Sequence, residues 1–147
     1  MTVGVIAAVV ELERDFDTTR PKIIGMRKRI GATHHMNSTD CQCRVPNSPP
    51  TLAEQIDIGV TEDYWYISRM RCSSCGTPWL RAFMEHEAFS RSGRHYRAPV
   101  TDAALIDITP EAALTLIENA TFKIAGGSYF DGVEIVINRL GKLISNP

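Results

Sequence analysis

The segment Met70-Arg71-Cys72-Ser73-Ser74-Cys75-Gly76-Thr77 holds two cysteines separated by two residues, with a glycine directly after the second. In a Cys-x-x-Cys knuckle of this kind the backbone turns so that both sulfur atoms face one metal ion. Gly76 suits such a turn, because glycine adopts a positive φ without a steric penalty. The segment therefore predicts one half of a metal site.

The other half is predicted at Cys41-Gln42-Cys43, which holds the remaining two of the four cysteines in the 147-residue chain. A structural Zn²⁺ site requires four ligands in a tetrahedron, and a set of four cysteines is common. We therefore predict that the chain binds a structural Zn²⁺, with iron as the alternative metal. The predicted ligands are Cys41, Cys43, Cys72 and Cys75.

The spacing of the cysteines leaves other interpretations open. A Cys-x-x-Cys pair is also typical of thioredoxin-like redox proteins, although there it lies between a strand and a helix. A framework of two disulfides is a further alternative, and it belongs to secreted chains. The Cys-x-Cys spacing is tighter than usual and the gap from Cys43 to Cys72 is long. His86 and His95 are therefore substitute ligands if one thiol points away.

The composition is that of an ordinary globular domain with a hydrophobic core, since 44% of the residues are hydrophobic and 22% are charged. The formal net charge of −1 disfavours a protein whose main task is to coat nucleic acid. The apolar run 3–10 is shorter than the roughly 20 residues of a membrane span, and it lacks the features of a signal peptide. Together with the paired thiols, these features predict a cytoplasmic protein.

Alternating apolar and polar residues predict an antiparallel β-meander around the knuckle. Its strands are expected near residues 63–72, 78–88 and 94–100. Aromatic and β-branched residues favour the first strand, which leads directly into Cys72. On this strand Trp65 and Ile67 are expected to share one face, and Tyr66 and Ser68 the other.

The clearest helix is predicted near residues 110–120, because Thr109 is a natural N-cap and Pro110 suits the first helical position. A closing strand is expected over residues 133–137. The predicted fold class is therefore α+β: an antiparallel sheet with a zinc knuckle and one main helix. Residues 1–35 are predicted to be an N-terminal extension or an accessory strand segment, and residues 36–147 the zinc-stapled domain.

The knuckle Cys72-Ser73-Ser74-Cys75-Gly76 resembles that of zinc-ribbon proteins. The resemblance covers about ten residues and implies a metal-stabilised β-hairpin without a particular activity. Small bacterial proteins of this build often act by binding another macromolecule, and toxin-neutralising immunity proteins are an example. This analogy concerns the class of fold and does not rest on matching residues.

A hairpin rich in arginine is the candidate surface for a partner, because arginine and tyrosine often anchor protein interfaces. Its residues are Arg91, Arg94, Tyr96 and Arg97. Four thiolates leave no open position on a metal, which disfavours catalysis there. We therefore expect a non-enzymatic, zinc-stabilised module that contacts another protein. A nucleic-acid-binding zinc ribbon is the first alternative, and a thiol redox protein or metalloenzyme the second.

Overall fold

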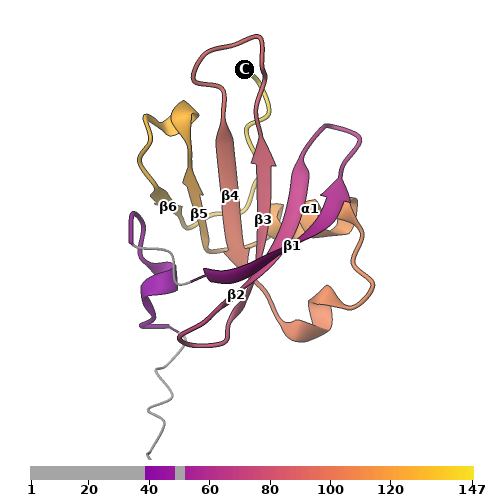
Figure 1. Cartoon of the computed structure of the whole chain (residues 1–147), viewed down its shortest axis with the longest axis vertical. Helices are drawn as coiled ribbons and strands as arrows, with labels where there is room; N and C mark the ends of the chain where they lie inside the picture. The colour runs from indigo at the N-terminus through magenta and orange to yellow at the C-terminus, as the bar shows by residue number, and fades with distance from the viewer. Residues whose placement is uncertain (1–38, 49–51) are drawn as a thin grey trace, which may run out of the picture. The chain divides into compact units, whose positions relative to one another are not determined.

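The computed structural model describes residues 39–48 and 52–147, all within the unit His34–Pro147 of the chain. In this part of the chain six strands form one antiparallel sheet in the order β1-β2-β3-β4-β5-β6 (Figure 1). The strands are β1 (Leu52–Val60), β2 (Tyr66–Cys72), β3 (Pro78–Met84), β4 (Arg94–Pro99), β5 (Lys123–Gly126) and β6 (Ile135–Ile137). The helices are α1 (Pro110–Glu118) and the short 3-10 turns η1 (Gln42–Arg44), η2 (Asp102–Leu105) and η3 (Ser128–Phe130). The α+β class, with an antiparallel sheet and one main helix, is confirmed.

Each strand turns one face towards α1 and the other away from it, because side chains alternate along a strand. On the α1 side, Ile67 of β2 and Leu80 of β3 pack against Ile117 in the main hydrophobic cluster. On the other face, Ser68 lies opposite Arg81, and Arg81 lies opposite Arg97 of β4. We call this side of the sheet the second face. The predicted division of β2, with Trp65 and Ile67 facing one way, is confirmed.

Helix α1 begins where the sequence predicts. The Thr109 hydroxyl accepts a hydrogen bond from the backbone N–H of Ala112 at 3.2 Å, and Pro110 occupies the first turn. Ala113 and Ile117 are its buried positions. At the other end, the Lys123 ammonium donates to the carbonyl oxygens of Ile117 and Glu118, a favourable position for a cation because the helix dipole is negative there.

The strands expected near residues 63–72 and 94–100 correspond to β2 and β4, whereas β3 ends at Met84, four residues before its predicted end. The reason lies in the following turn. The Ser92 hydroxyl accepts from the N–H of His86 and donates to the carbonyl of the same residue, so these groups are not available to a ladder. The predicted segment 1–35 lies outside the described residues, and the boundary at residue 36 stays a prediction. Within the described residues, no helix has the length and apolar character needed to cross a membrane.

Candidate metal centre

Four sulfur atoms converge at one end of the sheet. Cys41 and Cys43 come from the turn at η1, and Cys72 and Cys75 from the end of β2 and the loop after it. The sulfurs all lie within 4.8 Å of one another, with 3.6 Å between those of Cys41 and Cys72 and 3.7 Å between those of Cys43 and Cys75. All four are free thiols, since a disulfide bond would bring two sulfurs to about 2.05 Å. The four cysteines therefore fit a metal site.

The backbone of the knuckle turns tightly around its two cysteines. The N–H of Gly76 donates to the carbonyl of Cys72, and the N–H of Cys72 donates to the carbonyl of Thr77, both at 2.9 Å. Gly76 has a φ of 73°, a conformation that glycine adopts without strain. The Arg71 guanidinium donates to the Gly76 carbonyl at 2.8 Å and pairs with Asp102, which ties the knuckle to η2.

The long gap between the two cysteine pairs has a topological cause. The chain uses it to run out along β1 and return along β2, and in this antiparallel pair Leu52 lies opposite Cys72. The start of β1 is thus beside the end of β2, and Cys41 and Cys43 of the turn at η1 lie close to the knuckle. The gap is longer than in a compact zinc ribbon because it contains β1 and nearly all of β2.

The thiols are removed from solvent. Cys41, Cys43 and Cys72 are at most 3% exposed and share a second hydrophobic cluster with Trp79 and Ile124, while Cys75 is half-buried. Burial raises the pKa of the Cys43 thiol far above its usual value, and the neighbouring thiols add to this effect. A bound cation reverses this balance, because thiolates are the metal-binding form.

The Cys41 thiol experiences opposing influences. The backbone N–H of Cys43 hydrogen-bonds to it and lowers its pKa, while burial and the thiols of Cys75 and Cys72 raise it, so that the net change is upward. The hydrogen bond favours the thiolate, which is also the form that a metal would bind. The Arg44 guanidinium lies 5.2 Å from the ring centre of Phe122, which packs against the same cluster.

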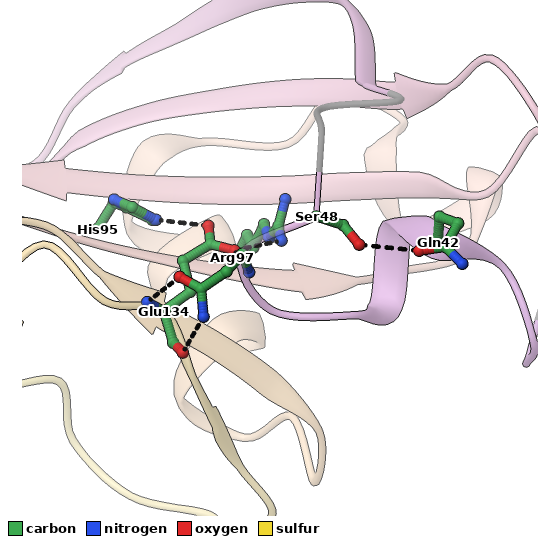
Figure 2. A network of polar contacts seen from close by, with 6 residues as sticks. Gln42, Ser48, His95, Arg97 and Glu134 are labelled. Atoms are coloured by element: carbon green, nitrogen blue, oxygen red, sulfur yellow. Dashed lines mark hydrogen bonds and ion pairs between the residues drawn. The ribbon is translucent and has the colours of Figure 1, made fainter.

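A polar network centred on Glu134 fastens the Cys41–Cys43 segment to the sheet, as Figure 2 shows. The Glu134 carboxylate accepts from the backbone N–H of Asn47 and from Arg97, both at 2.9 Å, and lies 3.2 Å from the Nε2 atom of His95. The Asn47 side chain makes two further hydrogen bonds to the backbone of Glu134, one as donor and one as acceptor. In the same segment the Ser48 hydroxyl donates to Gln42 at 2.8 Å. Glu134 thus joins the turn that carries two cysteines to β4.

The sequence did not reveal Asn47 or Glu134 as site residues, because 87 positions separate them in the chain. One local indication was present. Asn47 has a φ of 57°, and asparagine is among the few residues that adopt this left-handed conformation readily. Asn47 also lies between Pro46 and Pro49, so the sequence predicts a turn there but does not identify Glu134 as its partner.

The predicted substitute ligands point elsewhere. The Nε2 atom of His86 lies 2.8 Å from the carbonyl oxygen of Ser145, and His95 contacts Glu134. Within the described residues, the four cysteines form the one group of three or more His, Cys, Asp or Glu side chains close enough together to hold a metal ion. The two histidines therefore have structural contacts of their own.

His95 gives a pH-dependent prediction. Burial lowers the pKa of its imidazole below the usual 6.5, and this effect outweighs the hydrogen bond to Glu134. As the pH falls below 6.5, the unfolded chain binds a proton that the folded chain does not, so the free energy of unfolding falls. Urea unfolding from about pH 7.5 to about pH 5.5 should show this slope, and His95→Gln should flatten it. An equal slope in both proteins would show that His95 is not responsible.

The hairpin residues predicted to bind a partner do not share an exposed surface. Arg91 is exposed and pairs with Asp131, but Arg94, Tyr96 and Arg97 are 0%, 2% and 8% exposed. The Arg94 guanidinium donates to the carbonyls of Ser92, Ile144 and Asn146, and the Tyr96 hydroxyl accepts from the N–H of Ile144. Arg94 and Tyr96 therefore hold the C-terminal segment on the sheet, and Arg97 pairs with Glu134, which corrects the expectation that these side chains form a partner surface.

Four converging thiols can occupy all positions of a tetrahedral metal ion, which leaves none for a substrate or an activated water. The chemistry of this donor set is therefore that of a structural clamp between two segments of the chain. Comparison with protein-family models gives no match, and neither curated proteins nor solved structures match the chain.

Proposed function

We propose that this chain is a non-enzymatic binding module, stabilised by one structural Zn²⁺ in a zinc-ribbon-like knuckle, that acts by contacting another protein. The separation of the sulfur atoms supports the metal. Zinc–sulfur bonds of about 2.3 Å in a regular tetrahedron put neighbouring sulfurs about 3.8 Å apart. The pairs Cys41–Cys72 and Cys43–Cys75 lie at 3.6 and 3.7 Å, and all four sulfurs lie within 4.8 Å of one another.

The burial of the thiols favours a structural role for the metal. A zinc ion bound by four thiolates carries a charge of about −2, which is poor for lowering the pKa of a water molecule. Three of the four cysteines are also packed in a cluster with Trp79 and Ile124. This arrangement stabilises the fold and does not expose the metal to a substrate.

The edge of the sheet at β6 supports protein contact. Four apolar side chains here are well exposed: Val133 at 49%, Ile135 at 42%, Val136 at 38% and Leu140 at 59%. On its outer side β6 meets no further strand among the described residues. An edge of this kind can accept an extended strand of a partner, which adds backbone hydrogen bonds to apolar contacts. The net charge of −1 disfavours nucleic acid as the partner.

Affinity capture from extracts of the source cells tests this function. We expect the wild-type chain to retain a defined protein after nuclease treatment, and Val136→Lys to lose it while remaining folded. Glu87→Lys is the matched control, since Glu87 is exposed and lies on the loop after β3, away from β6. Capture that Val136→Lys leaves unchanged, or that nuclease abolishes, would overturn the proposed contact.

A further inference from the structure

A cavity of about 360 Å³ lies over β1, β2 and β3, at the opposite end of the strand order from β6. Its wall is bent because the pairing of β1 with β2 shifts register twice, between Ala53 and Ile56 and between Asp57 and Gly59. Gly59 has a φ of 149°, and a side chain there would come within 2.9 Å of Pro110. The volume falls in the range of small-molecule sites, which is about 300–1,000 Å³.

The cationic group of this cavity is Arg81. Its guanidinium carbon lies 5.1 Å from the ring centre of Phe83, a cation–π contact that does not use its N–H groups as hydrogen-bond donors to another side chain. Among the described residues, Arg81 makes no hydrogen bond or ion pair. Burial lowers the pKa of this half-buried group, and the charge of Arg97 lowers it further.

The neighbouring strand β4 places a second positive charge next to Arg81. Arg81 lies directly opposite Arg97 in the pairing of β3 with β4, and like charges in this position destabilise a sheet. The Arg97 charge is compensated by Glu134 at 2.9 Å. No described carboxylate does the same for Arg81, so an anion in the cavity would complete the charge balance of this row.

The aromatic residues that line the cavity indicate that the anionic ligand also has a flat apolar group. Tyr66 and Phe83 line the cavity with ring centres 6.4 Å apart, and Tyr66 is 57% exposed. Two rings set apart in this way offer apolar contact to a flat group. Two polar residues also line the cavity: Ser68, which lies opposite Arg81 in the pairing of β2 with β3, and the exposed Asp57.

The charges also restrict the ligand to few negative groups. Asp57 lines the same cavity and Glu134 lies beyond Arg97, so the second face is not a strip of uniform positive potential. A polyanion would meet these carboxylates, whereas a single carboxylate can pair with the fork of one guanidinium. The chemistry therefore favours a monoanion over a nucleic acid.

We propose that this cavity binds a small aromatic carboxylate, with the carboxylate paired to Arg81 and the ring against Tyr66 and Phe83. The inference is independent of the proposed contact at β6. It assigns a second site to the chain, on a different part of the sheet from the cysteines.

Titration of the isotope-labelled full chain with phenylacetate, followed by NMR, tests the proposal. We expect saturable shifts at the amides of Tyr66, Ser68 and Arg81, and at least tenfold weaker binding of the neutral probe phenylacetamide and of acetate, which has no ring. A charge-assisted, bidentate pair is strong enough to give such a difference. The absence of saturable shifts at these amides up to about 10 mM phenylacetate would overturn it.

Variants distinguish a specific role of the Arg81 guanidinium from the general effect of losing one positive charge. Arg81→Met should weaken phenylacetate binding at least tenfold, and Arg81→Lys should recover only part of the loss because it lacks the fork. Arg69→Met removes the same charge one residue from Ser68 but on the α1 side of the sheet, so it should bind as the wild type does. If Arg81→Met fails to fold, Arg81→Lys carries the test. Equal binding by Arg81→Lys and the wild type, or equal losses in Arg81→Met and Arg69→Met, would contradict the assigned role.

Discussion

Removal of the metal by a chelator is expected to lower the thermal unfolding midpoint of this protein by about 10 °C or more. A ligand present at about a thousand times its dissociation constant stabilises the folded state by about 4 kcal/mol. For a domain of this size, 4 kcal/mol corresponds to a shift of roughly 10–20 °C. The loss should begin at the cysteine end of the sheet, because the main cluster around Ile67 and Leu80 contains none of the four cysteines.

The measurement combines elemental analysis, thiol titration and thermal unfolding before and after chelation. We expect about one zinc per chain and four thiols that react only after the metal is removed. Trp79 is packed among three of the cysteines, so its fluorescence should report the change. Cys72→Ser should behave like the chelated protein, whereas Ser74→Ala, in the exposed turn that follows Cys72, should behave like the wild type.

Other outcomes distinguish the alternatives. Iron in place of zinc would keep the site and change the metal. Thiols that cycle to disulfides under mild oxidant in the purified protein, without any bound metal, would contradict the structural site and favour redox chemistry. An unfolding midpoint that chelation leaves unchanged would show that a bound metal does not stabilise the fold.

The sequence was sufficient for features that depend on neighbouring residues. The N-cap at Thr109, the alternation along β2 and the knuckle glycine Gly76 each follow from the properties of a few adjacent positions. The grouping of Cys41 with Cys72 was also predictable, because cysteines that occur in two pairs suggest a shared site. Local chemistry in these cases agrees with the tertiary structure.

Contacts between distant segments could not be predicted in the same way. Arginines in a turn-rich stretch suggest an exposed surface, yet Arg94 is buried by carbonyl groups 50 and 52 residues downstream, and Arg97 by a carboxylate 37 residues downstream. Burying an arginine is unfavourable unless such partners are present. The sequence gives no local indication of them, because they arise only when the folded sheet brings Glu134 and the C-terminal segment to β4.

The substitution Glu134→Gln is also expected to have a large effect, both on the free energy of unfolding and on the affinity for the metal. The carboxylate pairs with Arg97, and the two side chains are only 19% and 10% exposed. Loss of one partner from a pair this well buried is expected to cost about 2–3 kcal/mol, because Arg97 is left facing Arg81 without compensation. A glutamine oxygen can still accept from the N–H of Asn47, but it carries no charge, so the bond that anchors the Cys41–Cys43 segment becomes weaker.

For the metal, we expect Glu134→Gln to lower zinc affinity by roughly 10–100-fold, the usual effect of losing a group that positions a ligand. Competition with a chromogenic chelator measures this affinity, and urea unfolding of the metal-free chain measures stability separately. Asn47→Ala divides the two effects, since it removes the bonds to the Glu134 backbone and keeps the pair with Arg97. It should weaken zinc binding with little loss of metal-free stability, while Glu87→Gln should change neither. If Asn47→Ala binds zinc as tightly as the wild type, the two side-chain bonds of Asn47 do not contribute to the metal site, and the anchor of the Cys41–Cys43 segment reduces to the bond from the Asn47 backbone N–H to the Glu134 carboxylate.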